Sequence, residues 1–137
     1  MTFLRQIMSE LTSKLDSTLS PKQIQAIDGM SDQVRFDHLV KSMQQQKHVW
    51  TLANETGCLL IDTGEEKCLL LFSHQQLASE WAGQDHNTFT PLKIELPVFI
   101  EKWLPGMAND GFFLACQPNL EGEAFVEAPE DFGVNFR

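Results

Sequence analysis

The residues best able to do chemistry are Ser73 and His74, in "LFSHQ", where an apolar run passes into an amphipathic segment. A serine becomes a nucleophile when a histidine takes its proton and N–H groups stabilise the oxyanion. The junction of a strand with a helix is also where GxSxG enzymes hold their serine, but both glycines are missing here. Because serine is a preferred N-cap, we expect Ser73 to cap the next helix and His74 to be neutral and solvated.

The remaining histidines show no spacing typical of a metal site. His38, His48 and His86 fall in a helix, a strand and a loop of the expected fold, and the sequence lacks HxxxH, HExxH and CxxC. The glycines stand singly at expected turns, outside any GxGxxG or P-loop pattern. We therefore predict no metal ion and no bound cofactor.

The three cysteines, Cys58, Cys68 and Cys116, each lie among apolar residues. Such cysteines are typical of reduced thiols that pack as small apolar side chains. A turn at "TGEE" would pair Asp62 with Lys67, which places Cys58 and Cys68 on opposite faces of the hairpin. This register argues against a disulfide between them.

Acidic residues are crowded in the second half of the chain. Residues 1–50 carry six basic and five acidic side chains, whereas residues 51–137 carry four and fourteen, and the net charge is −9. Such a surface repels phosphate backbones and anionic lipids, so we expect neither nucleic-acid nor membrane binding. General acid–base pairs need a desolvated carboxylate facing another, but these carboxylates are neighbours in turns. We predict a solvated acidic rim and no catalytic residues.

The size and segment pattern indicate one cytosolic domain that spans residues 1–137. No stretch has the eighteen or more apolar residues that a membrane span needs, and the N-terminus lacks the continuous apolar core of a secretory signal. We expect a cytoplasmic location.

The first 47 residues have the periodicity of helices. An apolar stripe at three- and four-residue spacing predicts a first helix with Phe3, Leu4, Ile7, Met8, Leu11 and Leu15 on one face. Ser20 to Gln23 has the capping-box form, and that second helix stops at Gly29. A third helix starts at Ser31 or Asp32 and carries Phe36, Leu39, Val40 and Met43 on one face.

From His48 onward the sequence alternates between expected strands and helices. "HVWTLAN", the hairpin "CLLID"–"KCLLLF", "PLKIEL", "FFLACQ" and "AFVEA" predict strands. "SHQQLASEWAG" predicts a helix closed by Gly83, and the helix after Pro97 should end at Pro105–Gly106, with one further turn closed by Gly111. "PEDF" predicts a last helical turn. The order is typical of an α+β fold: a mostly antiparallel sheet of five to six strands (31–132) with helices packed on it, preceded by a helical segment (1–29).

The stretch from about residue 31 to residue 132 resembles a bacterial family known as domain of unknown function 2750. The resemblance rests on "VWTL" (49–52), "LLLFSHQQLASEWA" (69–82), "PLKIELPVFIEKWLPGMANDG" (91–111) and the end strands around "QPN" and "AFVEAP". It implies a fold, and it implies no activity, cofactor or catalytic residue.

The charge split favours a non-enzymatic module that binds another protein, for instance a basic one, through its acidic C-terminal face. The interaction surface that we predict comprises Trp50, Phe89, Trp103, Glu121, Glu123 and Glu127. The alternative is a small-molecule-binding or hydrolytic site near Ser73–His74 and the corner at Trp103–Pro105. Homodimerisation through the stripe of the first helix is compatible with either.

Overall fold

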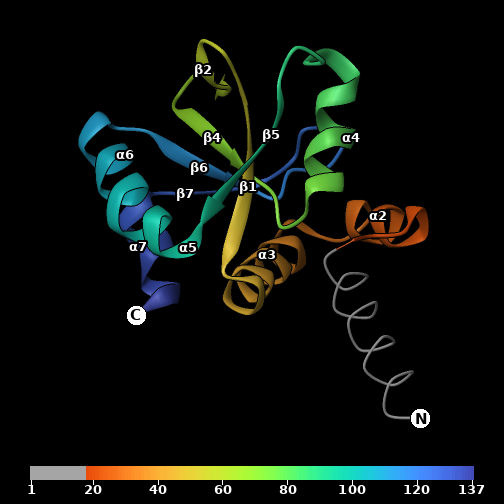
Figure 1. The fold of residues 1–137 in the computed structure, drawn as a ribbon, viewed down its shortest axis with the longest axis horizontal. Helices are drawn as coiled ribbons and strands as arrows, with labels where there is room; N and C mark the ends of the chain where they lie inside the picture. Colours follow the sequence, from red (N-terminus) through yellow and green to blue (C-terminus); the bar gives the residue numbers. More distant parts are fainter. Residues whose placement is uncertain (1–17) are drawn as a thin grey trace, which may run out of the picture.

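The computed structural model describes residues 18–137, and for Gln84 only the backbone. The predicted first helix, with its dimerisation stripe, lies outside these residues. Five main helical segments and seven strands follow (Figure 1). The helical segments are α2 (Pro21–Asp28), α3 (Asp32–Gln46), α4 (Gln75–Asp85), the helix α5–η1–α6 (Leu96–Asp110) and α7 (Pro129–Gly133), which runs into the 3₁₀ turn η2 (Val134–Phe136). The strands are β1 (His48–Asn54), β2 (Gly57–Cys58), β3 (Leu60–Asp62), β4 (Lys67–Leu71), β5 (Thr90–Glu95), β6 (Phe113–Cys116) and β7 (Phe125–Glu127).

α2 begins with the predicted capping box, and α3 begins at the predicted boundary. The hydroxyl of Ser20 accepts from the backbone N–H of Gln23, whose side chain accepts from the N–H of Ser20, so the capping box is complete. The hydroxyl of Ser31 accepts from the N–H of Val34 at the start of α3. Both helices therefore begin where short-range hydrogen bonding places them.

The α+β class is confirmed, but the strands form two sheets rather than one. The first sheet has the order β2-β1-β5 and is antiparallel; the second has the order β3-β4-β6-β7 and contains the parallel pair β4–β6. In the part of the chain that the structure describes, a single antiparallel bridge, Trp50 with Phe72, joins them. β4 already pairs with β3 on one edge and with β6 on the other, so β1 meets the chain just beyond the end of β4. The expected register of the hairpin, Asp62 opposite Lys67, is confirmed.

The predicted helix stop at Pro105–Gly106 is wrong. The helix runs from Leu96 to Asp110, with a π-helical turn, η1 (Phe99–Trp103), just before Pro105, and it ends at Gly111 in the left-handed conformation (φ 76°). A proline ring normally collides with the carbonyl of the preceding turn. The wider π turn relieves that crowding and lets the helix continue.

The sheets are covered on both faces. α3, the 96–110 helix and α7 pack on one face, with Leu39, Phe99 and Phe132 fully buried. α4 packs on the other face over Leu52, Leu70 and Phe72. In Figure 1, α5, α6 and α7 gather on one side of the strands and α2 and α4 on the other. Within the described residues, no helix is both long and apolar enough to cross a bilayer.

Candidate functional site

A polar stripe on α3 faces the carboxyl ends of the parallel strands β4 and β6. It comprises Arg35, His38, Ser42 and Gln46, which recur every three or four residues and so share one side of the helix. Gln46 Nε2 donates to the carbonyl of Ser73 at 3.2 Å. The stripe therefore joins α3 to the two points where the chain leaves these strands.

The expectation of a capping Ser73 and a solvated His74 is wrong. His74 is the N-cap of α4 and makes no capping hydrogen bond with its side chain, and both residues are buried, with Ser73 fully inaccessible. Ser73 Oγ instead accepts from Gln117 Nε2 at 2.8 Å and lies 2.7 Å from His74 Nδ1. Because the apolar strand β4 runs straight into this junction, the two side chains are drawn inward and not toward solvent.

Gln117 connects this pair to the polar stripe. Its backbone is left-handed (φ 53°), and its side chain accepts from the N–H of Ser73 at 2.7 Å. Its Nε2 also lies 3.0 Å from His38 Nδ1, and the rings of His38 and His74 stack with centroids 5.9 Å apart. An amide nitrogen only donates, so His38 Nδ1 must accept, which requires a neutral ring. Burial, and to a lesser degree Lys41, lower the pKa of His38 below 6.5, in agreement.

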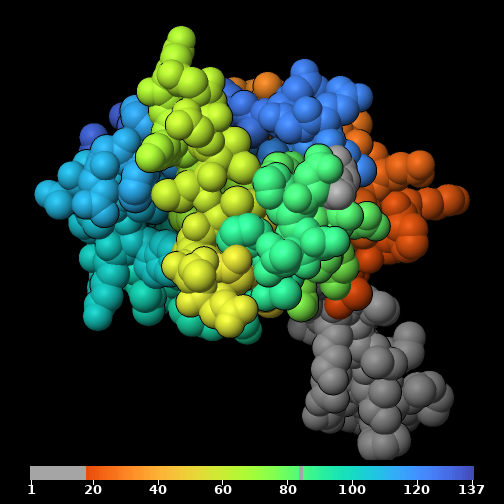
Figure 2. All heavy atoms as spheres, turned by 90° about the horizontal axis from the view of Figure 1, so that it is seen from above, coloured from red at the N-terminus to blue at the C-terminus, as the bar shows by residue number. Residues whose placement is uncertain are grey.

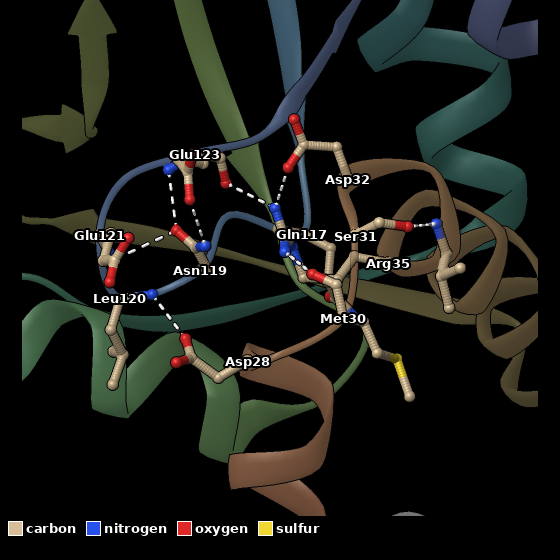
Figure 3. A network of polar contacts seen from close by, with 11 residues as sticks. Asp28, Met30, Ser31, Asp32, Arg35, Gln117, Asn119, Leu120, Glu121 and Glu123 are labelled. Carbon is tan, nitrogen blue, oxygen red and sulfur yellow. Dashed lines mark hydrogen bonds and ion pairs between the residues drawn. The ribbon is translucent and has the colours of Figure 1, made fainter.

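Arg35 lies beside the loop between β6 and β7, residues 117–124, and contacts it at both ends (Figure 3). Its side chain is about 1% exposed; Nε donates to the carbonyl of Gln117 at 2.9 Å and one terminal nitrogen to that of Glu123 at 3.0 Å. It also contacts the carbonyl of Met30 and the carboxylate of Asp32. A buried guanidinium is tolerable only when its donors are satisfied, and here they brace both ends of the loop.

The loop also carries its own hydrogen bonds. Asn119 Oδ1 accepts from the N–H groups of Glu121 (3.1 Å) and Glu123 (2.8 Å), and Asn119 Nδ2 donates to the carboxylate of Glu123 at 3.0 Å. The carboxylate of Asp28, at the end of α2, accepts from the N–H of Leu120 at 2.7 Å. Gly122 supplies the left-handed residue of the turn (φ 86°). The loop is thus fixed by its own hydrogen bonds, by Asp28 at the end of α2 and by Arg35 on α3.

The side chains that this braced loop presents are apolar and acidic. Leu120 is 39% exposed, and Glu121 and Glu123 are exposed. The described residues contain two ion pairs, Arg35–Asp32 and Lys93–Glu95, and neither involves these glutamates. Glu127 on β7 is half-buried, and burial, followed by the charge of Asp131, raises the pKa of its carboxyl.

The predicted aromatic part of the interaction surface is divided between the two faces of the sheets. Trp50 and Phe89 are half-buried against the cluster under α4. Trp103 packs against the opposite cluster, on the 96–110 helix. The structure therefore brings Glu121 and Glu123 together on one loop but does not bring the three aromatic side chains to one patch.

The cysteines and histidines form no metal-ligating group in the described part of the chain. All three cysteines are free, and burial raises the pKa of each thiol, most strongly that of Cys116. No cluster of three His, Cys, Asp or Glu side chains suited to a metal ion occurs among residues 18–137. His86, expected in a loop, is half-buried and stacks on Trp81 with ring centroids 5.0 Å apart.

The fold and the braced loop define a small α+β domain with a buried polar junction. The comparisons with known proteins make this more specific. The chain belongs to the family described as protein of unknown function (DUF2750), whose pattern it matches over residues 36–135. The match covers the third helix, both sheets and α7, which confirms the resemblance drawn from the sequence. No curated protein and no solved structure matches the chain.

Proposed function

We propose that this protein is a cytosolic binding module without catalytic activity of its own, and that it recognises a basic segment of another protein through the braced loop. The observation that carries the proposal is the buried Arg35, whose guanidinium donates hydrogen bonds to main-chain carbonyls at both ends of a surface loop. Loops held in this way lose less conformational entropy on binding than mobile ones.

The chemistry of the loop supports a basic partner. Glu121 and Glu123 offer negative charge that no ion pair in the described residues neutralises, and Leu120 offers an exposed apolar contact. On β7, Val126 (37% exposed) adds an apolar contact, while the half-buried Glu127 lies on the other face of the strand. An extended segment with alternating basic and apolar side chains complements such a surface, and the charges would speed its association.

Ser73 and His74 do not support hydrolysis in this arrangement. Ser73 Oγ is inaccessible and contacts Gln117 and His74, so a substrate carbonyl has no path to it. The pair is better explained as the part of the polar junction that fixes Gln117 and hence the start of the loop.

The proposal is tested by co-purification at low and high salt. A variant with Glu121, Glu123 and Glu127 changed to Gln should lose a partner that the unchanged chain retains at low salt, because the charge attraction is removed. The matched control changes Glu55, Glu80 and Glu101, which are exposed and lie elsewhere, to Gln; it alters the net charge equally and should retain the partner. A partner that survives both high salt and the loop substitutions would refute the proposal, as would equal loss in the control.

A further inference from the structure

A groove lies at the opposite end of the parallel pair, where β4 and β6 begin. It has a volume of about 380 Å³ and separates the β3–β4 hairpin from the 96–110 helix. Its lining is mainly apolar and includes Cys58 on β2, Leu60 and Leu69 on the hairpin, and Trp103 and Met107 on the helix. Figure 2 shows the yellow-green residues of the hairpin beside the cyan to light-blue residues of the helix and β6. The volume falls within the range typical of small-molecule sites.

The groove continues into an acidic hollow beside the hairpin turn. Asp110 and Phe112 line both, and the hollow adds Asp62, Glu65, Glu66 and Lys67. Leu60 in the groove and Asp62 in the hollow are two residues apart on β3 and so face the same way. One end of this surface is therefore apolar and the other acidic.

The charges around the two hollows do not cancel. Four carboxylates face two ammonium groups, those of Lys67 and Lys102, and none of the six side chains forms an ion pair in the described part of the chain. Lys102 lines the apolar groove, eight residues and so roughly 12 Å along the helix from Asp110. The acidic end suits one positively charged group, and the ammonium of Lys102 disfavours a second positive charge at the other end of the same ligand.

Two groove residues on the helix are unfavourable for the helix itself. Gly106 has no positive φ, and a Cβ added there would meet nothing within 4 Å, yet glycine inside a helix costs about 1 kcal/mol relative to alanine. Asp110 stands in the last turn, where the helix dipole disfavours a carboxylate. Residues four apart share one face of a helix, so Gly106 and Asp110 both lower the stability of the helix on the side that lines the groove. Local rules are typically broken in this way at functional sites.

We propose that this groove binds a small organic monocation in which an apolar, aromatic body is joined to an ammonium head. The body lies in the space that Gly106 leaves open, against Trp103, Leu60 and Met107. The head lies at Asp110, where the groove meets the acidic hollow. The site is separate from the braced loop, and it does not depend on the proposed function.

The test uses 4-phenylbutylamine as the probe and amide NMR shifts of the ¹⁵N-labelled full chain as the readout. We expect saturable shifts in residues 58–69 and 103–113 and little effect around residue 120. Gly106→Leu should fill the groove, abolish these shifts and raise the thermal stability, because leucine is the better helix former. Gly106→Ala is the matched control: it stabilises the helix similarly and retains binding. Asp110→Asn should weaken binding about threefold, the effect of one exposed charge pair.

Ligand controls separate the two parts of the recognition. Three ligands should bind more weakly than the probe. 4-Phenylbutyrate replaces the ammonium with a carboxylate, and butylamine lacks the aromatic body. Spermidine also lacks the aromatic body and carries more than one positive charge. Equal binding of 4-phenylbutyrate, unchanged binding by the Gly106→Leu variant, or the absence of saturable shifts with the probe would each overturn the proposal.

Discussion

Replacing Arg35 by Met tests whether the braced loop depends on the buried guanidinium. Methionine fills similar space but cannot donate to the carbonyls of Gln117, Met30 and Glu123. Only the bond to Gln117 is fully buried, so that carbonyl suffers the full cost of an unsatisfied acceptor, while water can reach the others. The loss of the charged hydrogen bonds and the orphaned carbonyl together should destabilise the chain by about 3 kcal/mol. For a chain of this length, the melting temperature should fall by about 10 °C.

The measurement is urea unfolding followed by far-UV circular dichroism, with the slope against urea checked for two-state behaviour. Lys41→Met, an exposed position on the same helix, is the control and should stay within about 0.5 kcal/mol of the unchanged chain. Arg35→Lys keeps the charge but not the planar fork, so its loss should lie between the two. The reasoning fails if Arg35→Met unfolds within about 1 kcal/mol of the unchanged chain, because the hydrogen bonds would then contribute no more than generic packing.

Two further predictions concern the polar junction. A double-mutant cycle with Ser73→Ala and Gln117→Leu should give a coupling energy of about 1 kcal/mol or more, because the two side chains contact each other directly; additive effects would show that this contact contributes nothing to stability. Because the pKa of His38 in the folded chain lies below 6.5, mainly through burial, the unfolded chain takes up the proton first as the pH falls. The stability that neutral His38 confers is complete above pH 6.5 and is lost as the pH falls through its folded pKa. His38→Gln should flatten this decline in urea titrations between pH 7 and pH 5, and an unchanged slope would contradict it.

The features that the sequence predicts correctly are local ones. The capping box at Ser20, the start of the third helix at Ser31 or Asp32, and the pairing of Asp62 with Lys67 each depend on residues at most five apart. The parallel pairing of Cys68 with Phe113 spans a helix, a strand and another helix, and no periodicity within β4 or β6 encodes it. The expectation of a single sheet failed for the same reason: sheet membership is decided by tertiary packing.

Only part of the candidate site could be predicted from the sequence. Glu121 and Glu123 stand out as charges in a segment without basic residues. The contacts of Arg35 with their loop could not be predicted from the apolar pattern of α3. The signal that could have revealed it is a second, polar stripe at positions 35, 38, 42 and 46, beside the apolar stripe. A helix with two adjacent stripes needs a partner with buried polar groups, and here the partner is the junction at Ser73 and Gln117.

The two ends of the parallel pair β4–β6 are used differently, which decides where function should be sought. In open sheets with parallel strands, ligands commonly bind at the carboxyl ends. Here that end is filled by Arg35, His38, Ser73, His74 and Gln117, whose polar groups satisfy one another. Substitutions there should therefore lower stability first. At the amino end, Gly106 and Asp110 weaken their own helix and border a groove, so Gly106→Leu should raise stability while it removes binding. Opposite signs of the stability change at the two ends would support this division, and a loss of stability at both would refute it.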